Sequence, residues 1–419
     1  MTDPTLDPGL FSSVPVAAGS DFPVQNLPFG VFSAPQRAHR VGVAIGDHIL
    51  DLAETQAAGH LDGLGLPHRA VAAASLNPLL ACGPEVWRAL RLRVSALLTT
   101  EDAMGVDLDR FLVPATAATM HLPVEITDYV DFYSSIHHAT NVGRMFRPDD
   151  PPLMPNWRHL PVGYHGRSST VVVSGTPVIR PVGQLPGREG PRFGPCEKLD
   201  FEAEVGFVAG VGNPMGSTIP VVDAEGHIFG MCLVNDWSAR DIQAWEYRPL
   251  GPFLAKSFAT TISPWLVTLD ALAPFRVDAP VQDPAPPAYL AGGAGGAVDL
   301  ALSVELNGEV ITRPRFAEMY WTMRQQLAHA TVNGAAVTPG DLFASGTVSG
   351  PDDDRLGCLL ELTWNGSRPI EVGGERRRFL ADGDTVVING RAEATGATPI
   401  GFGPCAGTVM PARDGDRTA

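Results

Sequence analysis

The segment DFYSSIHHATNVGRMFR, from Asp131 to Arg147, gathers reactive side chain types in a run that is otherwise small and apolar. Its acid, phenol, imidazole and guanidinium groups are Asp131, Tyr133, His137, His138, Arg144 and Arg147. Imidazole is the side chain that most readily exchanges a proton near neutral pH. The segment therefore indicates site chemistry, although a surface loop with one core histidine would contain the same residue types.

A second candidate stretch is LDFEAEVGF, which has the alternation of a half-buried β-strand. Alternation places Glu202 and Glu204 on one face and Phe201, Ala203 and Val205 on the other. Two neighbouring carboxylates raise each other's pKa unless a cation lies between them. A solvent-facing edge is the usual fate of such a pair in isolation, but Asp236 is a candidate to share the same face.

Asp236 follows the apolar strand IFGMCLV, in the segment NDWSARDIQAWEY. Asn235 or Asp236 is a good helix cap, so we expect a helix to begin there. Helical spacing then places Asp236, Arg240, Gln243 and Tyr247 in one polar stripe. A polar stripe directly after a core strand predicts the wall of a site.

The acidic residues of these segments form an all-oxygen ligand set: Asp131, Glu202, Glu204 and Asp236. Oxygen ligands suit hard divalent cations such as Mg²⁺ or Ca²⁺ and do not suit thiophilic metals. The sequence predicts one such cation and leaves the choice between the two open.

The elements that must position these groups are mostly strands. A turn at Gly46–Asp47 in VGVAIGDHILDL predicts a hairpin, and PEVWRALRLRVSALL predicts an amphipathic helix over 84–98. Further strands are predicted in VVVSGTPVI, FEAEVGFVAG, IFGMCLV, LALSVELNG, LLELTW and DTVVING. A later helix is predicted in PRFAEMYWTMRQQLAHATVNG and ends before Gly334. Residues 274–297 are predicted to form a surface loop.

Length and charge restrict the class of protein. The chain has 419 residues and a net charge of −16, which argues against nucleic acid or an anionic membrane as the main partner. No apolar run approaches the roughly 18 residues of a membrane span, and MTDPTLDPGL does not resemble a secretory signal. Five cysteines without a CxxC pair fit a reduced, cytoplasmic location. Lysine occurs only at Lys198 and Lys256, so a retained lysine suggests a need for a compact ammonium group.

Taken together, these segments resemble the fumarylacetoacetate hydrolase family in its long form, which has an N-terminal domain. The resemblance runs almost end to end. It includes DFPVQNLPFGVF, DYVDFYSSIHHATNVGRMFR, LMPNWRHLPVGYHGRSSTVVVSGTPV, LDFEAEVGF, NDWSARDIQAWEYRPLGPFLAKSFATTISPW, MYWTMRQQLAHATVNG, ASGTVSGP and GFGPCAGTVMPA. It implies a mainly β (α+β) protein with a small SH3-like N-terminal β domain, residues 1–118. A larger mixed β-sandwich-roll domain, residues 119–419, would carry the site, and the protein would be a homodimer.

The implied activity is hydrolysis of the carbon–carbon bond of 4-fumarylacetoacetate, a dicarboxylate diketone, to fumarate and acetoacetate at the end of tyrosine and phenylalanine breakdown. The resemblance places the active-site cation on Asp131, Glu202, Glu204 and Asp236. It places water activation on His138, oriented by Glu361. It places oxyanion stabilisation on Arg240, Gln243 and Lys256, and substrate contacts on Tyr133, Arg147, Tyr164, Tyr247 and Thr347.

A second, structural Mg²⁺ site near Lys256 and Thr260 is also implied, but Ala259 stands where the family pattern has glycine. Two other readings remain open. One is a related acylpyruvate hydrolase, decarboxylase or hydratase, although such relatives lack the long N-terminal domain and the DFYxxxHA segment. The other is a metal-binding protein without catalysis, which predicts damage at His138, Glu361 or Lys256 that the sequence does not show.

Overall fold

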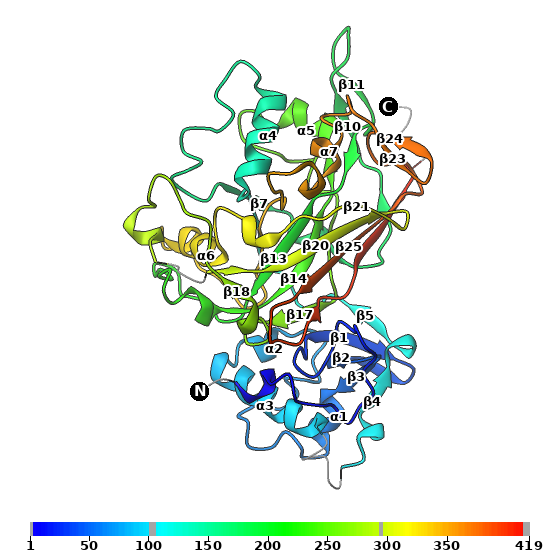
Figure 1. Cartoon of the computed structure of the whole chain (residues 1–419), viewed down its shortest axis with the longest axis vertical. Helices are drawn as coiled ribbons and strands as arrows, with labels where there is room; N and C mark the ends of the chain where they lie inside the picture. Colours follow the sequence, from blue (N-terminus) through cyan, green and yellow to red (C-terminus); the bar gives the residue numbers. More distant parts are fainter. Residues whose placement is uncertain (1–2, 100–105, 293–295, 414–419) are drawn as a thin grey trace.

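The structure is a computed structural model that describes residues 3–99, 106–292 and 296–413. Figure 1 shows a small N-terminal part, coloured blue to cyan, beneath a larger part that contains the rest of the chain. Among the described residues, strands outnumber α-helices in both parts, as the sequence predicts. The predicted boundary between residues 118 and 119 stays a prediction. None of the helices in the described ranges is long and apolar enough to cross a membrane.

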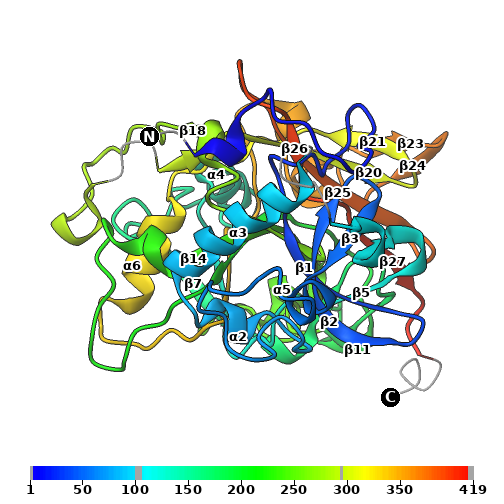
Figure 2. The same ribbon diagram turned by 90° about the horizontal axis from the view of Figure 1, so that it is seen from below.

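In its described residues, the N-terminal part is built on antiparallel strands and three α-helices. Its strands are β1 (Phe29–Ala34), β2 (Arg37–Ile45), β3 (His48–Asp51), β4 (Leu112–Pro114) and β5 (Thr119–His121), and its helices are α1 (Leu52–Ala57), α2 (Asn77–Leu80) and α3 (Pro84–Leu98). The predicted hairpin is confirmed, because β2 and β3 pair across Gly46 and Asp47. The predicted helix over 84–98 is confirmed as α3, which buries Leu90, Val94 and Leu97 and lies beside these strands in Figure 2.

A long mixed sheet continues from β1 into the larger part, in the order β4-β3-β2-β1-β17-β14-β13-β22-β6-β7. Its further members are β17 (Trp265–Thr268), β14 (Ile228–Asp236), β13 (Ala203–Ala209), β22 (Leu342–Ala344), β6 (Tyr129–Phe132), β7 (Gly163–Gly166), β16 (Thr260–Ile262) and β8 (Val171–Val173). The central pair β13 and β14 is buried along its whole length. This pair forms the rigid base of the larger part.

A second sheet packs against one face of the first (Figure 1). Its strands are β21 (Glu309–Thr312), β20 (Leu300–Leu306), β25 (Thr385–Ala392), β27 (Cys405–Met410), β9 (Val178–Ile179) and β26 (Ile400–Gly401). Four two-stranded ribbons complete the strands: β10 (Val182–Leu185) with β11 (Arg192–Pro195), β12 (Leu199–Asp200) with β15 (Ser238–Ala239), β18 (Arg276–Val277) with β19 (Ala297–Val298), and β23 (Ile370–Val372) with β24 (Glu375–Arg377). The core between the two sheets contains Val205, Phe207, Leu233, Leu302 and Ile388.

The opposite face of the central sheet serves two purposes. Over its lower half, Val208, Phe229 and Leu342 pack with the core of the N-terminal part. Alternation along the strands then places the acidic residues of β13, β14 and β6 on this same face, beyond the end of that core. The N-terminal part therefore covers half of the face and leaves the other half for the site.

The larger part has four helices in the described ranges, and three local predictions about helices are wrong. The helices are α4 (Ile136–Phe146), α5 (Arg240–Glu246), α6 (Met323–Thr331) and α7 (Leu359–Leu362). The segment LLELTW forms the short helix α7 rather than a strand, because apolar runs of this length do not distinguish the two. Asn235 and Asp236 end β14 and cap no helix, because α5 begins only at Arg240.

The third correction concerns the helix predicted in the segment 314–334. The structure has a short 3-10 turn at Phe316–Glu318, and α6 begins only after Thr322. Thr322 and Gln325 form a capping box, in which each side chain accepts a hydrogen bond from the other residue's backbone N–H, and this fixes the start of α6. Gly334 follows the end of the helix with φ of 87°. The predicted loop 274–297 contains β18 and, outside residues 293–295, little regular structure.

One buried cation ties α3 to the chain that leads into β1. Arg91 is 1% exposed, and its guanidinium donates to the carbonyl oxygens of Gln25 and Asn26, both at 2.5 Å. Replacing Arg91 with Met leaves both carbonyls buried without a charged donor. We expect the free energy of unfolding to fall by roughly 2–4 kcal/mol. Denaturant unfolding followed by circular dichroism measures this loss.

Arg88 is the matched control, three residues earlier on the same helix. Its side chain is 67% exposed and pairs with Asp270 at 3.2 Å. Because exposed ion pairs contribute at most about 1 kcal/mol, Arg88→Met should cost little. Equal losses for the two variants would contradict the role given to Arg91.

Candidate active site

Four buried carboxylates meet at the upper end of the central sheet. Asp131 comes from β6, Glu204 from β13 and Asp236 from the end of β14, while Glu202 directly precedes β13. One oxygen from each of the four lies within 4.8 Å of the others. The structure thus brings together the set that the sequence suggested, and it does so through strand alternation and register.

This group of carboxylates lacks enough protein partners for its charge. Burial and the charge of Asp236 raise the pKa of Asp131, and burial and the charge of Asp131 raise the pKa of Glu204. Asp131 Oδ1 and Glu204 Oε1 are buried without a hydrogen-bond partner in the described part of the chain. Two unpartnered carboxylate oxygens in an all-oxygen set fit a hard divalent cation such as Mg²⁺ or Ca²⁺. These four residues are therefore the ones that would hold it.

Cationic and hydroxyl groups surround the remaining oxygens. Lys256 contacts Glu202 and donates to Asp236 Oδ2 at 2.5 Å. Tyr164 donates to the same Asp236 oxygen at 3.2 Å, and Thr260 donates to Asp236 Oδ1 at 2.9 Å. Burial alone would lower the pKa of Lys256, but the charges of Asp236 and Glu202 outweigh it and raise that pKa. Lys256 therefore remains an ammonium ion.

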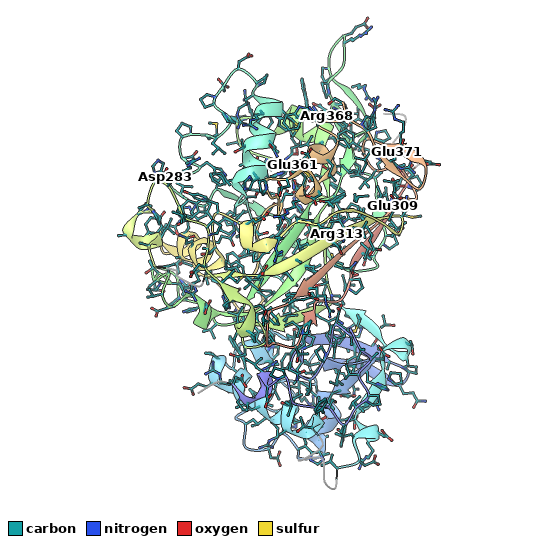
Figure 3. The ribbon with its side chains drawn as sticks, viewed as in Figure 1. Asp283, Glu309, Arg313, Glu361, Arg368 and Glu371 are labelled. Carbon is teal, nitrogen blue, oxygen red and sulfur yellow. The ribbon has the colours of Figure 1, made fainter. Side chains whose placement is uncertain are left out.

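A histidine–carboxylate pair lies beside this cluster. His138 is on the first turn of α4, whose cap Ser135 accepts from the His138 backbone N–H at 3.2 Å. His138 Nδ1 lies 2.6 Å from Glu361 Oε2, and both residues are buried. Figure 3 shows Glu361 in the interior of the larger part, whereas Arg368 and Glu371 lie farther out. The pair joins α4 to α7, two segments more than 200 residues apart in sequence.

Several donors keep Glu361 ionised. Asn141, one turn after His138 on α4, donates to Oε1 at 2.9 Å, and Ser349 donates to Oε2 at 2.7 Å. Burial would raise the pKa of Glu361, but the His138 charge and these hydrogen bonds outweigh it and lower that pKa. An ionised Glu361 accepts the Nδ1 proton of His138, which leaves Nε2 as the nitrogen with a free lone pair.

Arg240 forms the third part of the site. Its Nε donates to Asp200 Oδ2 at 2.8 Å, and its Nη1 contacts Glu202 at 2.7 Å and Gln243 at 3.1 Å. Its Nη2 is buried without a partner in the described residues. Gln243 follows on α5 and Tyr247 caps the end of that helix. The predicted stripe thus survives from Arg240 onward, although Asp236 joins it from a strand.

A cavity of about 330 Å³ connects these groups. His138, Glu202, Arg240 and Lys256 line it together with Asp131, so the histidine, two of the four carboxylates and the cations face one space. The five residues predicted to contact substrate also line it: Tyr133, Arg147, Tyr164, Tyr247 and Thr347. The buried Arg147 Nε and Thr347 Oγ1 have no partner within the described ranges, so both can bind a ligand.

The structure also adds residues that the sequence did not reveal. Asn141, Ser349 and Asp200 orient the groups described above, and Phe146 and Leu250 supply apolar wall. Spacing on α4 could have identified Asn141, because positions 138 and 141 share a helix face. Ser349 and Asp200 gave no local signal. His137, the neighbour of the predicted base, lines a different cavity with Arg158 and Glu318. The role of Lys256 and Thr260 in a second cation site stays a prediction.

Comparisons with known proteins agree on one family. The family model described as fumarylacetoacetate (FAA) hydrolase C-terminal matches residues 128–410, and the one described as fumarylacetoacetase N-terminal matches residues 25–123. The chain is 51% identical over 422 residues to the fumarylacetoacetase of Bos taurus, covering 96% of this chain and 99% of the relative. It is 52% identical over 417 residues to that of Caenorhabditis elegans, with the same coverage.

Solved structures share the fold at lower identity. A fumarylacetoacetate hydrolase from psychrophilic Exiguobacterium antarcticum has a TM-score of 0.54 at 18% identity, covering 92% of this chain and all of that one. A maleylpyruvate hydrolase from Sphingobium sp., solved with manganese(II) and pyruvate, has a TM-score of 0.51 at 16% identity, covering 92% of this chain and 100% of that one. At these identities the likeness concerns the fold alone.

The carboxylate cluster predicts that a hard cation stabilises the protein. Saturating Mg²⁺ or Ca²⁺ should raise the thermal unfolding midpoint. At a cation concentration of 100 times the dissociation constant, the free energy of unfolding should rise by about 2.7 kcal/mol. Glu204→Gln should abolish this gain and leave the cation-free protein at least as stable, because one like charge is removed. Scanning calorimetry with and without chelator measures both effects.

Two controls separate site binding from general salt effects. Potassium chloride at matched ionic strength should not reproduce the gain. Asp341→Asn removes a buried carboxylate that accepts from Thr338 and the Asp128 amide, away from the cluster, and should keep the gain. An unchanged cation response in Glu204→Gln would contradict the assignment.

Proposed function

The chain belongs to the fumarylacetoacetate hydrolase family and is a hydrolase, and we propose on that premise that it cleaves 4-fumarylacetoacetate to fumarate and acetoacetate. The chain is 50–52% identical to three curated fumarylacetoacetases over nearly the full length of both chains, and this similarity supports the substrate. The observation that carries the proposal is geometric. His138, oriented by Glu361, lines the same cavity as Asp131 and Glu202, two members of the four-carboxylate cluster suited to a hard cation.

The proton-transfer group in this proposal is His138. Its Nε2 accepts a proton from water as the water oxygen bonds to the carbonyl carbon of the substrate. Glu361 stabilises the imidazolium that results, because the carboxylate stays ionised beside it. When the carbon–carbon bond breaks, its electron pair leaves with the acetoacetate part as an enolate. The proton held at Nε2 can then return to that fragment.

The other charged groups stabilise the negative charge that develops. A hard divalent cation at Asp131, Glu202, Glu204 and Asp236 would supply Lewis acid chemistry at the oxygens of the 1,3-dicarbonyl. Arg240, whose Nη2 has no partner in the described residues, lines the cavity together with Gln243 and Lys256. Preorganised donors of this kind typically contribute about 10²–10³ in rate each. All three are in place before substrate arrives.

Substrate binding requires positive charge inside an acidic protein. Arg147 lines the cavity and donates through Nη2 to the Pro152 carbonyl, which holds the guanidinium while Nε remains available for a carboxylate of the substrate. Tyr133, Tyr164, Tyr247 and Thr347 provide hydroxyl groups around the same space. We further propose a cytoplasmic homodimer that acts in tyrosine and phenylalanine breakdown, and a second structural Mg²⁺ near Lys256 and Thr260.

A direct assay separates this function from that of an acylpyruvate hydrolase. We expect purified protein to consume fumarylacetoacetate, followed by its loss of absorbance, and to lose this activity after chelation. An acylpyruvate should be turned over far more slowly. Added Mg²⁺ or Ca²⁺ should restore the activity. Preference for the acylpyruvate would contradict the substrate assignment, and turnover that survives exhaustive chelation would contradict the cation.

His138→Ala tests the assignment of the base. We expect kcat to fall by about 10²–10⁴, the usual contribution of a positioned base, with KM and the cation-induced stabilisation nearly unchanged. Steady-state kinetics and calorimetry on the same preparation measure these quantities. His137→Ala is the matched control, because the adjacent imidazole lines a different cavity and should leave kcat as it is. Near-native turnover by the His138 variant would refute its role.

A further inference from the structure

Asp200 is a fully buried carboxylate that none of the steps above uses. It ends the short strand β12 and pairs there with Ser238 of β15. Its side chain accepts three hydrogen bonds: from Leu359 N at 2.7 Å, from Leu360 N at 2.9 Å and from Arg240 Nε at 2.8 Å. The first two donors belong to α7 and the third begins α5, so one side chain joins two helices.

On one side, Asp200 fixes the helix that carries Glu361. The first backbone N–H groups of a helix have no partner within it. In the described structure, Cys358 at the N-cap of α7 makes no side-chain cap hydrogen bond. Asp200 supplies the acceptors instead, from a distant segment, to the two residues that directly precede Glu361. The position of the Glu361 carboxylate relative to His138 therefore depends on Asp200.

On the other side, Asp200 fixes Arg240. It holds Nε, while Glu202 and Gln243 hold Nη1. These three contacts determine the plane of the guanidinium and leave Nη2 without a partner in the described residues, on a side chain that lines the cavity. No hydrogen bond in the described structure joins Arg240 directly to His138 or Glu361.

We infer that Asp200 is a positioning residue that couples the water-activating pair, His138 and Glu361, to the oxyanion donor Arg240. The roles given to the two ends of this link, the His138–Glu361 pair and Arg240, rest on the proposed function. The link itself rests on the three hydrogen bonds of Asp200. An aspartate suits the position because both oxygens must accept. In an asparagine, the amide nitrogen would face either Leu359 N–H or the donors from Leu360 and Arg240, so one end of the link must move.

The kinetic test is Asp200→Asn at saturating cation. We expect kcat to fall roughly 10- to 100-fold, as for other residues that orient reacting groups, while KM changes little. In a Glu361→Gln background the same substitution should cost much less, because residues that act as a unit are not additive. An equal loss in both backgrounds would overturn the proposal.

Asp384→Asn is the matched control. Asp384 is also a buried carboxylate that accepts from an arginine, Arg377, and from a backbone N–H, that of Ala381. It precedes β25, away from the cavity. We expect this variant to lose stability comparably and to keep its kcat. A matching fall in kcat would mean that the Asp200 effect is general destabilisation, which would overturn the proposal.

A spectroscopic test does not depend on turnover. The Nδ1 proton of His138, in a 2.6 Å contact with Glu361, should give a strongly deshielded proton NMR signal, assigned by its loss in Glu361→Gln. We expect this signal to shift or vanish in Asp200→Asn and to stay in place in Asp384→Asn. An unchanged signal in folded Asp200→Asn would overturn the link even in an active enzyme.

Arg240→Lys tests the link from the other end, and it replaces Asp200→Asn as the test if that variant does not fold. It removes the Nε donor from Asp200 without touching His138 or Glu361, and should still shift the His138 signal. An unmoved signal there would overturn the coupling. If the variants show these shifts of the His138 signal but the native protein does not hydrolyse fumarylacetoacetate, the link is supported and the proposed substrate fails.

Discussion

The rest of the site depends on one constraint, the burial of four carboxylates at one end of a sheet. Carboxylates removed from water are stable only when cations or hydrogen-bond donors replace the lost solvation. The described chain brings Lys256 and Arg240 to Glu202 and Asp236, but it leaves Asp131 Oδ1 and Glu204 Oε1 without partners. The protein alone therefore compensates only part of this negative charge. The unpartnered oxygens of Asp131 and Glu204 are the part of the site where a bound cation would supply the rest.

The placement of the cluster has a structural cause in the central sheet. The face that carries the carboxylates is the one that packs, lower down, on the core of the N-terminal part. Such a face can be polar only where that packing ends. Three of the carboxylates lie on strands and Glu202 directly precedes one, so backbone hydrogen bonds of the sheet fix their spacing, whereas His138 and Arg240 lie on helices. The carboxylates of the cluster and the proposed reacting groups thus come from different elements.

The sequence alone predicted which residues share a strand face and where charged groups occur, but it did not predict long-range contacts. Alternation in LDFEAEVGF predicted that Glu202 and Glu204 share a face, because period two is a local property. The sequence LLELTW carried no such information: as four helical residues it has too few positions to show a period. Asp200, some 160 residues earlier, accepts from the first two amides of this helix, a contact that no local pattern can reveal. Roles for Glu361, Tyr133 and Thr347 came from family resemblance. Only the folded chain places Tyr133 and Thr347 on the wall of one cavity and Glu361 behind His138.

The two lysines show how environment selects the base. Lys198 donates to Asn365 and lies over the ring of Phe379, which is a packing role. Lys256 faces the cavity, but a general base must hold a free lone pair at working pH. The carboxylates raise its pKa and keep it protonated. Glu361 is ionised but lies behind His138 rather than on the cavity wall. These observations support the proposed role of His138, whose imidazole lines the described cavity, as the group that accepts a proton from water.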